Sequence, residues 1–136
     1  MHKIFHHKVK VYYEDTDAGE VVYYANYLKY LERARTEALS SIGLSNKIIK
    51  KKIGTLIIVK SCNIEYKKSA HLEDELNIES HIITLKKTSL IMKQLIRLEK
   101  ELICDAEIHL VFVNSSGKPE KIPDEIIKNF LPYVKK

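Results

Sequence analysis

The sequence predicts an α+β domain in which one long helix covers an antiparallel sheet. A single long helical pattern lies near the start of the chain, and four strand-like patterns follow it. Short links join these four strands, which favours antiparallel neighbours because parallel strands need long crossover connections. We therefore expect a meander of consecutive strands. A chain of 136 residues is most simply one domain, spanning 1–136.

The first element is a strand predicted over about residues 5–14, which ends in a turn rich in carboxylates. The turn contains the run Asp-Thr-Asp-Ala-Gly at 15–19. Aspartate favours turns because its side chain readily accepts hydrogen bonds from nearby backbone N–H groups. The strand is therefore expected to stop at this run.

The second element is a helix predicted from about Asn26 to Ile42. Its apolar positions recur every three or four residues, as on one face of a helix, at Tyr24, Leu28, Leu31, Ala34 (or Arg35), Ala38 and Ile42. Gly43 is a typical stop signal, and Ser45 could cap a short lysine-rich helix that reaches Gly54.

Most of the remaining chain has the alternating pattern of strands. We expect strands at 56–66, from 76 to about 82, at 90–98 and at 102–112. The last is the clearest, because the residues at 102, 104, 106, 108, 110 and 112 form one apolar face, while Asp105, Glu107 and His109 point the other way. A turn at 114–119 ends it, and Pro123 could open a final short helix that reaches about Leu131.

Composition indicates a soluble globular protein, with 45% hydrophobic and 30% charged residues. No apolar run is long enough to span a membrane, and residues 1–8 contain no apolar signal core, so we expect a cytoplasmic location. Cys62 and Cys104 lie in apolar strand-like segments without a CxxC spacing or a neighbouring histidine. Reduced core thiols are expected, and neither a disulfide nor a metal site.

The net charge of +5 comes with lysine runs at 50–52, 67–68, 86–87 and 135–136. Such runs form a solvated surface or attract an anionic partner, either nucleic acid or a phosphate-bearing cofactor. No aromatic RNA-binding strand, GXXG loop or zinc finger is present. Nucleic acid is therefore not expected as a partner.

The main chemical feature is a pair of carboxylates just before the start of the long helix. A carboxylate in this position can attack an acyl carbonyl or activate water against it, and the free N–H groups of the helix start can polarise that carbonyl. The alternative is that Asp15 and Asp17 only shape the turn. Burial of one of them in an apolar cleft would alter its pKa and its nucleophilicity.

Tyrosines crowd the same region, at 12, 13, 23, 24, 27 and 30. Core packing is expected for most of them, whereas for Tyr24 both packing and the lining of an acyl pocket stay open. The histidines show no spacing typical of metal ligands, so no metal is expected. The chain has no GxSxG, P-loop or GxGxxG motif, which leaves serine-hydrolase, kinase and dehydrogenase chemistry unsupported.

The segment YYEDTDAGEVVYYANYLKYLERARTEAL, at 12–39, resembles the signature of the hotdog-fold acyl-CoA thioesterases. More narrowly, it is similar to the 4-hydroxybenzoyl-CoA thioesterase-like branch and to the thioesterases associated with the bacterial Tol–Pal system. The turn YKKSAHLED at 66–74 and the strand pattern extend the resemblance over nearly the whole chain. The resemblance implies a long central helix wrapped by a five-stranded antiparallel sheet.

The resemblance also implies a function and a site. The expected activity is hydrolysis of acyl-coenzyme A to free acid and coenzyme A, with Asp17 as nucleophile or general base. The backbone N–H near Tyr24 would polarise the thioester. No cofactor is implied, since coenzyme A is part of the substrate, and the residues that bind it are not identified. Active sites at the interface of a homodimer, paired into a homotetramer, and a peripheral link to cell-envelope proteins are further implications.

Two residues depart from the family pattern. Tyr24 stands where many Tol–Pal-type members have histidine, and Glu20 stands where a second glycine is common. Without that histidine, hydrolysis must depend on Asp17, water and backbone N–H groups. The missing histidine also argues against a hotdog hydratase or dehydratase. The remaining alternative is a non-catalytic acyl-CoA-binding or cell-envelope-associated scaffold protein of the same fold.

Overall fold

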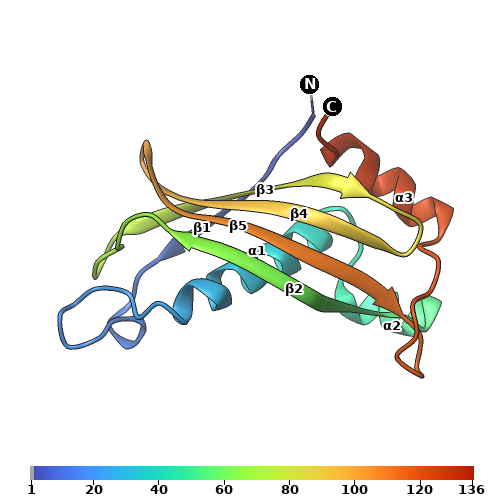
Figure 1. Ribbon diagram of the computed structural model, residues 1–136, viewed down its shortest axis with the longest axis horizontal. Coiled ribbons are helices and arrows are strands. Elements are labelled where there is room, and N and C mark those ends of the chain that lie inside the picture. Colours follow the sequence, from blue (N-terminus) through green and yellow to red (C-terminus); the bar gives the residue numbers. More distant parts are fainter. Residues whose placement is uncertain (1) are drawn as a thin grey trace.

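The computed structural model describes residues 2–136, without the side chains at 46, 52 and 53. One sheet wraps around a central helix, with its strands in the order β1–β3–β4–β5–β2 and every neighbouring pair antiparallel (Figure 1). The strands are β1 (Phe5–Lys10), β2 (Leu56–Tyr66), β3 (Glu75–Leu85), β4 (Ser89–Leu98) and β5 (Glu101–Val113). The helices are α1 (Asn26–Ser41), α2 (Asn46–Ile53) and α3 (Asp124–Phe130). The predicted α+β class and the five-stranded antiparallel sheet are confirmed.

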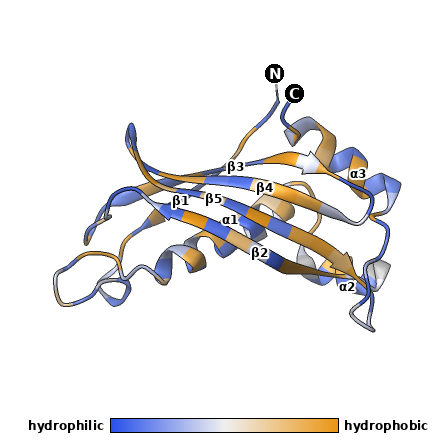
Figure 2. Ribbon diagram, in the orientation of Figure 1, coloured by the Kyte–Doolittle hydropathy of each residue, from blue (hydrophilic) through white to orange (hydrophobic). Residues whose placement is uncertain are grey.

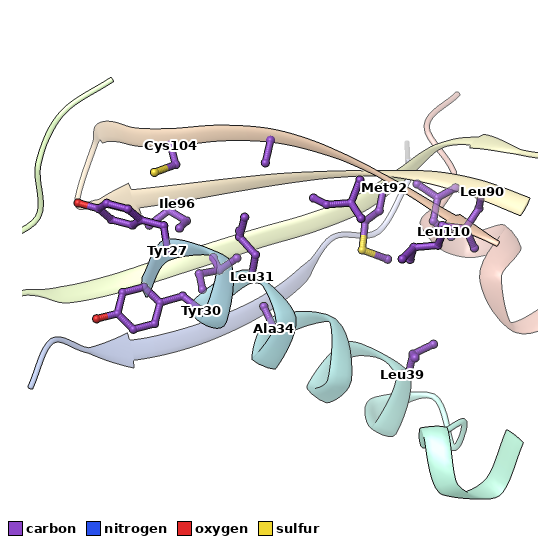
Figure 3. Packing of buried hydrophobic residues seen from close by; sticks show 14 of the residues in the cluster. Tyr27, Tyr30, Leu31, Ala34, Leu39, Leu90, Met92, Ile96, Cys104 and Leu110 are labelled. Carbon is purple, nitrogen blue, oxygen red and sulfur yellow. The ribbon is translucent and has the colours of Figure 1, made fainter. Parts of the chain in front are cut away.

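Helix α1 packs one side onto the sheet, where its buried residues meet those of β4 and β5 (Figure 3). The buried residues of α1 are Tyr27, Tyr30, Leu31, Ala34, Ala38 and Leu39. The predicted apolar stripe is therefore right for its middle but wrong for Tyr24 and Leu28, which are exposed. Tyr24 lies before the first helical residue, so the helical spacing does not extend back to it.

A buried polar network fastens α1 to the middle of the sheet. Gln94 of β4 is fully buried and donates from Nε2 to the Leu31 carbonyl (3.1 Å) and to the Ser80 hydroxyl (3.0 Å). Its Oε1 accepts from Nη1 of Arg35 at 2.9 Å. Because both ends of the amide are hydrogen-bonded, its burial carries little penalty, and the network fixes where α1 sits on the sheet.

The predicted meander is wrong for β2, which pairs with β5 at the far edge of the sheet and not with β3. The link at 67–74 instead carries the chain across the N-terminal end of α1. There the Ala70 N–H donates to the Tyr27 hydroxyl at 2.9 Å, and the Ala70 carbonyl accepts from Val22 at 2.9 Å. The link therefore connects β2 at one edge of the sheet to β3 beside β1 at the other side. The spacing of residues along the sequence does not reveal this connection.

Two strands differ from their predicted form at the sheet edges. Strand β1 stops at Lys10, four residues earlier than expected, because a 3₁₀ turn at Tyr13–Asp15 replaces its end. Strand β2 begins with a hydrophobic run at 56–59 and mixes hydrophilic and hydrophobic residues after it (Figure 2), and it is exposed along most of its length at the edge of the sheet. Cys62 on β2 is consequently exposed and is not the core thiol expected, whereas Cys104 is buried. Burial raises the pKa of the Cys104 thiol to about 12.

The C-terminal part of the chain closes the other end of the sheet. Helix α3 buries Ile126 and Phe130, and the Phe130 ring lies 6.4 Å from that of Phe112 of β5. The tail returns to β3, where the Lys135 N–H donates to the Ile82 carbonyl at 2.7 Å. The predicted final helix is thus confirmed. In the part of the chain that the structure describes, no helix has the length and hydropathy to cross a membrane.

Candidate active site

The carboxylate turn forms a small hairpin that leads into α1. Thr16 and Val22 form an antiparallel bridge, flanked by hydrogen bonds from Asp17 N–H to the Val21 carbonyl (2.9 Å) and from Tyr23 N–H to the Asp15 carbonyl (3.0 Å). Residues 18–20 form the tip. The hairpin explains how a run of turn-forming residues holds Asp17 a short distance along the chain from the helix start.

One carboxylate oxygen of Asp17 stabilises the turn, and the other is free of hydrogen bonds to the described residues. Its Oδ1 accepts the Gly19 N–H at 2.8 Å, which is the local hydrogen bond expected of an aspartate in a turn. Within residues 2–136, Oδ2 has no such contact, so it can accept a proton or act as a nucleophile. The side chain is exposed in the single chain, and the apolar cleft considered from the sequence is not formed by one copy.

The start of α1 offers unpaired backbone donors. Asn26 N–H donates to the Tyr23 carbonyl at 2.8 Å and Tyr27 N–H to the Tyr24 carbonyl at 3.3 Å. The N–H groups of Tyr24 and Ala25 have no acceptor among the described residues, and no side chain caps the helix there. Uncapped donors at the positive end of a helix dipole can bind a developing negative charge on oxygen.

The link at 67–74 holds this hairpin in place from the other side. Val21 and His71 form an antiparallel bridge, and Leu72 N–H donates to the Glu20 carbonyl at 3.0 Å. Below them, the Tyr27 hydroxyl accepts the Ala70 N–H at 2.9 Å, and burial raises the pKa of Tyr27. The sequence indicated a turn here, but its contact with the Asp17 hairpin joins segments far apart in the chain and could not be read from spacing.

Asp15 ties the hairpin to the helix, which supports the shaping role considered for it. Its carbonyl accepts from Asn26 Nδ2 at 2.8 Å, and its Oδ2 accepts the Tyr12 N–H at 2.9 Å. The Tyr30 hydroxyl is fully buried and has no hydrogen-bond partner among the described residues. Burial raises the pKa of Tyr30, and the neighbouring Asp15 carboxylate adds to the rise.

The tyrosines divide into two groups. Tyr27 and Tyr30 are buried, and Figure 3 shows both hydroxyls pointing toward the N-terminal end of α1. Tyr12, Tyr13, Tyr23 and Tyr24 are exposed, so the expectation of core packing is wrong for the first three. Tyr24 contacts Tyr23 and the exposed Tyr66 of β2, with ring centroids 5.0 and 6.1 Å away. These rings form an aromatic surface beside the free N–H groups.

The lysines at 67–68 form ion pairs near the site. Lys67 pairs with Glu65 at 2.7 Å, and Lys68 with Glu101 at 3.4 Å, so this lysine run is partly neutralised. Over the described residues, no group of three or more histidine, cysteine, aspartate or glutamate side chains could hold a metal ion. The absence of a metal and of a cofactor stays a prediction.

Comparison with known proteins identifies the family. The model of the thioesterase-like superfamily matches residues 11–130. Acyl-CoA thioester hydrolase YbgC of Escherichia coli O6:H1 is 37% identical over 129 residues, covering 93% of this chain and 96% of the relative. Acyl-CoA thioesterase YbgC of Haemophilus influenzae is 33% identical over 123 residues, covering 90% of each chain. A probable thioesterase from Bartonella henselae superimposes with a TM-score of 0.85 at 27% identity, covering 89% of this chain and 100% of that one.

This chain belongs to the thioesterase-like superfamily. The predicted hotdog fold and the predicted class of enzyme, a thioesterase, are confirmed at this level. The segment that carried the resemblance, residues 12–39, contains the hairpin, Asp17 and most of α1. The roles of Asp17 and Tyr24 come from that resemblance and from the geometry above, and they are argued below.

Proposed function

We propose that this protein hydrolyses the thioester of acyl-coenzyme A, with Asp17 as the catalytic carboxylate. The observation that carries the proposal is an available Asp17 Oδ2 on the hairpin that leads directly into the start of α1, where the Tyr24 and Ala25 N–H groups are free. Membership of the thioesterase-like superfamily and the activity named for the YbgC relatives support the choice of substrate. A non-catalytic scaffold would have no need for both groups.

The reaction can proceed with water as the nucleophile. Asp17 Oδ2 takes a proton from water, whose oxygen forms a bond to the thioester carbon. The carbonyl oxygen becomes an oxyanion and accepts hydrogen bonds from the N–H near Tyr24. When the C–S bond breaks, the thiolate of coenzyme A takes the proton from Asp17, leaving the free acid. In the alternative route, Asp17 attacks the carbon itself, the C–S bond breaks to release the thiolate of coenzyme A, and water then hydrolyses the mixed anhydride to free acid and regenerated Asp17.

The proposed site needs a second copy of the chain. Asp17 and Tyr24 are exposed in the single chain, whereas electrostatic stabilisation is effective only where water is excluded. The exposed apolar residues Leu56, Ile58 and Val59 lie on the unpaired edge strand β2. Such an edge readily pairs with another strand. We therefore propose a homodimer, which could pair further into a homotetramer.

Substitution of Asp17 tests the mechanism. Asp17→Asn keeps the size of the side chain and the acceptor for Gly19 but removes the base, so kcat should fall by about 10²–10⁴-fold with the fold intact. Asp15→Asn should cost much less, because an amide oxygen can still accept the Tyr12 N–H. Tyr24→Phe should also be mild, because the proposed donor is a backbone N–H.

Two outcomes would contradict this assignment. Full activity of Asp17→Asn on every acyl-CoA that the wild type hydrolyses would rule out Asp17 as the catalytic carboxylate. A loss in Tyr24→Phe as large as that in Asp17→Asn would assign the electrophilic role to the phenol. A screen of short, long and aromatic acyl-CoAs with the wild type would define the acyl preference.

The basic charge is proposed to serve coenzyme A and not nucleic acid. Free coenzyme A should raise the melting temperature, because a ligand that binds only the folded state stabilises it, whereas a random oligonucleotide should not. The opposite ranking would favour a nucleic-acid function. A cytoplasmic location and a peripheral link to cell-envelope proteins stay predictions, which fractionation and co-purification would test.

A further inference from the structure

A groove lies between the β3–β4 hairpin and the C-terminal helix, away from the proposed active site. It has a volume of about 500 Å³, in the range of small-molecule sites. Its apolar lining comes from the end of β3 and from the C-terminal segment 122–134: Leu85, Ile122, Ile127, Leu131 and Val134. The charged residues around it are Lys86, Lys87, Lys121 and Asp124. Neither the sequence patterns nor the proposed reaction gives this groove a role.

Backbone hydrogen bonds fix the walls of the groove. Ile122 N–H donates to the Lys87 carbonyl at 2.8 Å, and Lys86 N–H to the Ser89 carbonyl at 2.8 Å. On the other side, Lys135 N–H donates to the Ile82 carbonyl at 2.7 Å, which seats Val134 against β3. The apolar lining is therefore held open by main-chain contacts on both sides and is available without rearrangement.

The groove is far from Asp17. The hairpin that holds Asp17 follows β1, whose last residue, Lys10, pairs with Glu75 at the start of β3. The groove lies at Leu85, the other end of the same strand of 11 residues. At about 3.3 Å per residue, the two ends of β3 are roughly 30 Å apart. Figure 1 shows α3 and the Asp17 hairpin at opposite ends of the molecule.

The charges favour an anionic occupant. Lys121 is 3.8 Å from Asp124, but Lys86 and Lys87 have no carboxylate partner among the described residues. A second copy of the chain is disfavoured, because a two-fold contact here would bring two basic rims together in a protein of net charge +5. Nucleic acid would leave the apolar lining unused. An apolar groove with lysines beside it suits a ligand that has one anionic head and one aliphatic chain.

We propose that this groove binds a fatty-acid carboxylate, with the head beside Lys86 and Lys87 and the chain over Ile127 and Leu131. The groove is then a second site, separate from the place of hydrolysis. Because binding here involves no reaction and no contact with Asp17, the proposal does not depend on the proposed thioesterase mechanism.

Calorimetry with dodecanoate below its micellar concentration tests the site on the full chain. One dodecanoate should bind per chain to the wild type and to Asp17→Asn with the same affinity. Leu131→Asp and the double variant Lys86→Glu/Lys87→Glu should each weaken binding by about tenfold or more. The first places a negative charge in the apolar lining of the groove, and the second reverses the charge beside the carboxylate head. Lys100→Glu, in the β4–β5 turn, is the matched control and should bind like the wild type. Dodecan-1-ol, which lacks the charge, should bind more weakly and without response to the lysine reversal.

Each contrary outcome overturns the proposal. Absence of dodecanoate binding up to millimolar concentration would leave the groove without this ligand. Binding that is lost in Asp17→Asn but kept in both groove variants would place the fatty acid in the active site. Binding only to phosphatidylglycerol vesicles would indicate a membrane contact. If Leu131→Asp changes the light-scattering mass and leaves dodecanoate binding intact, the groove is a contact between copies.

Discussion

Glu20 has a backbone conformation that glycine adopts without strain. Its φ is +62°, in the left-handed region, which costs a residue with a side chain about 1–2 kcal/mol. This is the position where family members often have a second glycine. Glu20→Gly removes the strain, but glycine loses more conformational freedom on folding, so we expect a net gain in unfolding free energy of up to about 1 kcal/mol.

Thermal unfolding with a matched control checks this prediction. Glu14→Gly, in the 3₁₀ turn that precedes the hairpin, removes no positive φ and should be neutral or destabilising. A lower melting temperature for Glu20→Gly would mean that the Glu20 side chain stabilises the hairpin in a way that the backbone angle does not explain.

Gly19 is predicted to set the direction of the Asp17 carboxylate. A Cβ at Gly19 would lie 3.3 Å from Asp17 Oδ1, the oxygen that already accepts the Gly19 N–H. Gly19→Ala must push this oxygen by a few tenths of an ångström, and we expect kcat to fall roughly three- to tenfold because catalysis is sensitive to small misplacements. The melting temperature, measured alongside, should change little. An unchanged kcat would show that this hydrogen bond does not orient the carboxylate.

At the scale of elements, two buried phenols of α1 predict a loss of stability at high pH. Burial raises the folded-state pKa values of Tyr27 and Tyr30 above the usual 10. Above pH 10 the unfolded chain releases these protons while the folded chain keeps them, so the unfolding free energy decreases as pH rises. The stabilisation is complete below pH 10 and is lost progressively as pH rises toward the folded pKa values.

Tyr30→Phe isolates one of these phenols. Its hydroxyl has no hydrogen-bond partner among the described residues, so the variant should be as stable as the wild type at pH 7. Above pH 10, it should lose stability less steeply, by at most about 1.4 kcal/mol per pH unit. Urea unfolding at several pH values measures both. Equal slopes in the two proteins would mean that Tyr30 does not contribute to alkaline unfolding.

The elements and the class of fold could be predicted from the sequence, but the order of the strands in the sheet could not. The helix at 26–42 and the strands after it follow from local periodicity, and so does the turn that contains Asp17. The position of β2 in the sheet depends on which strand pairs with it. Its pattern of apolar and polar residues would fit several neighbouring strands equally well. The contact of Ala70 with Tyr27 depends on how the link at 67–74 crosses the helix.

At the scale of the whole molecule, activity is predicted to depend on association of two chains. Val59 is 49% exposed on the unpaired edge of β2. Val59→Lys places like charges together wherever two such edges meet, and it should shift the light-scattering mass toward a monomer with a parallel loss of hydrolysis. Lys100→Glu, outside this edge, should change neither. A wild-type protein that is monomeric and active at micromolar concentration would contradict the proposed dimer.

The link at 67–74, which joins the edge strand β2 to the inner strand β3, also holds the Asp17 hairpin in place. Val22 N–H of the hairpin donates to the Ala70 carbonyl of the link, and Leu72 N–H of the link donates to the Glu20 carbonyl of the hairpin. If either segment detaches, the other therefore loses these hydrogen bonds. Local opening should therefore expose their amides together, as one cooperative unit in hydrogen exchange. It also follows that the Asp17 hairpin becomes ordered only after β2 and β3 have both been placed, late in folding, since its support spans a long separation along the chain.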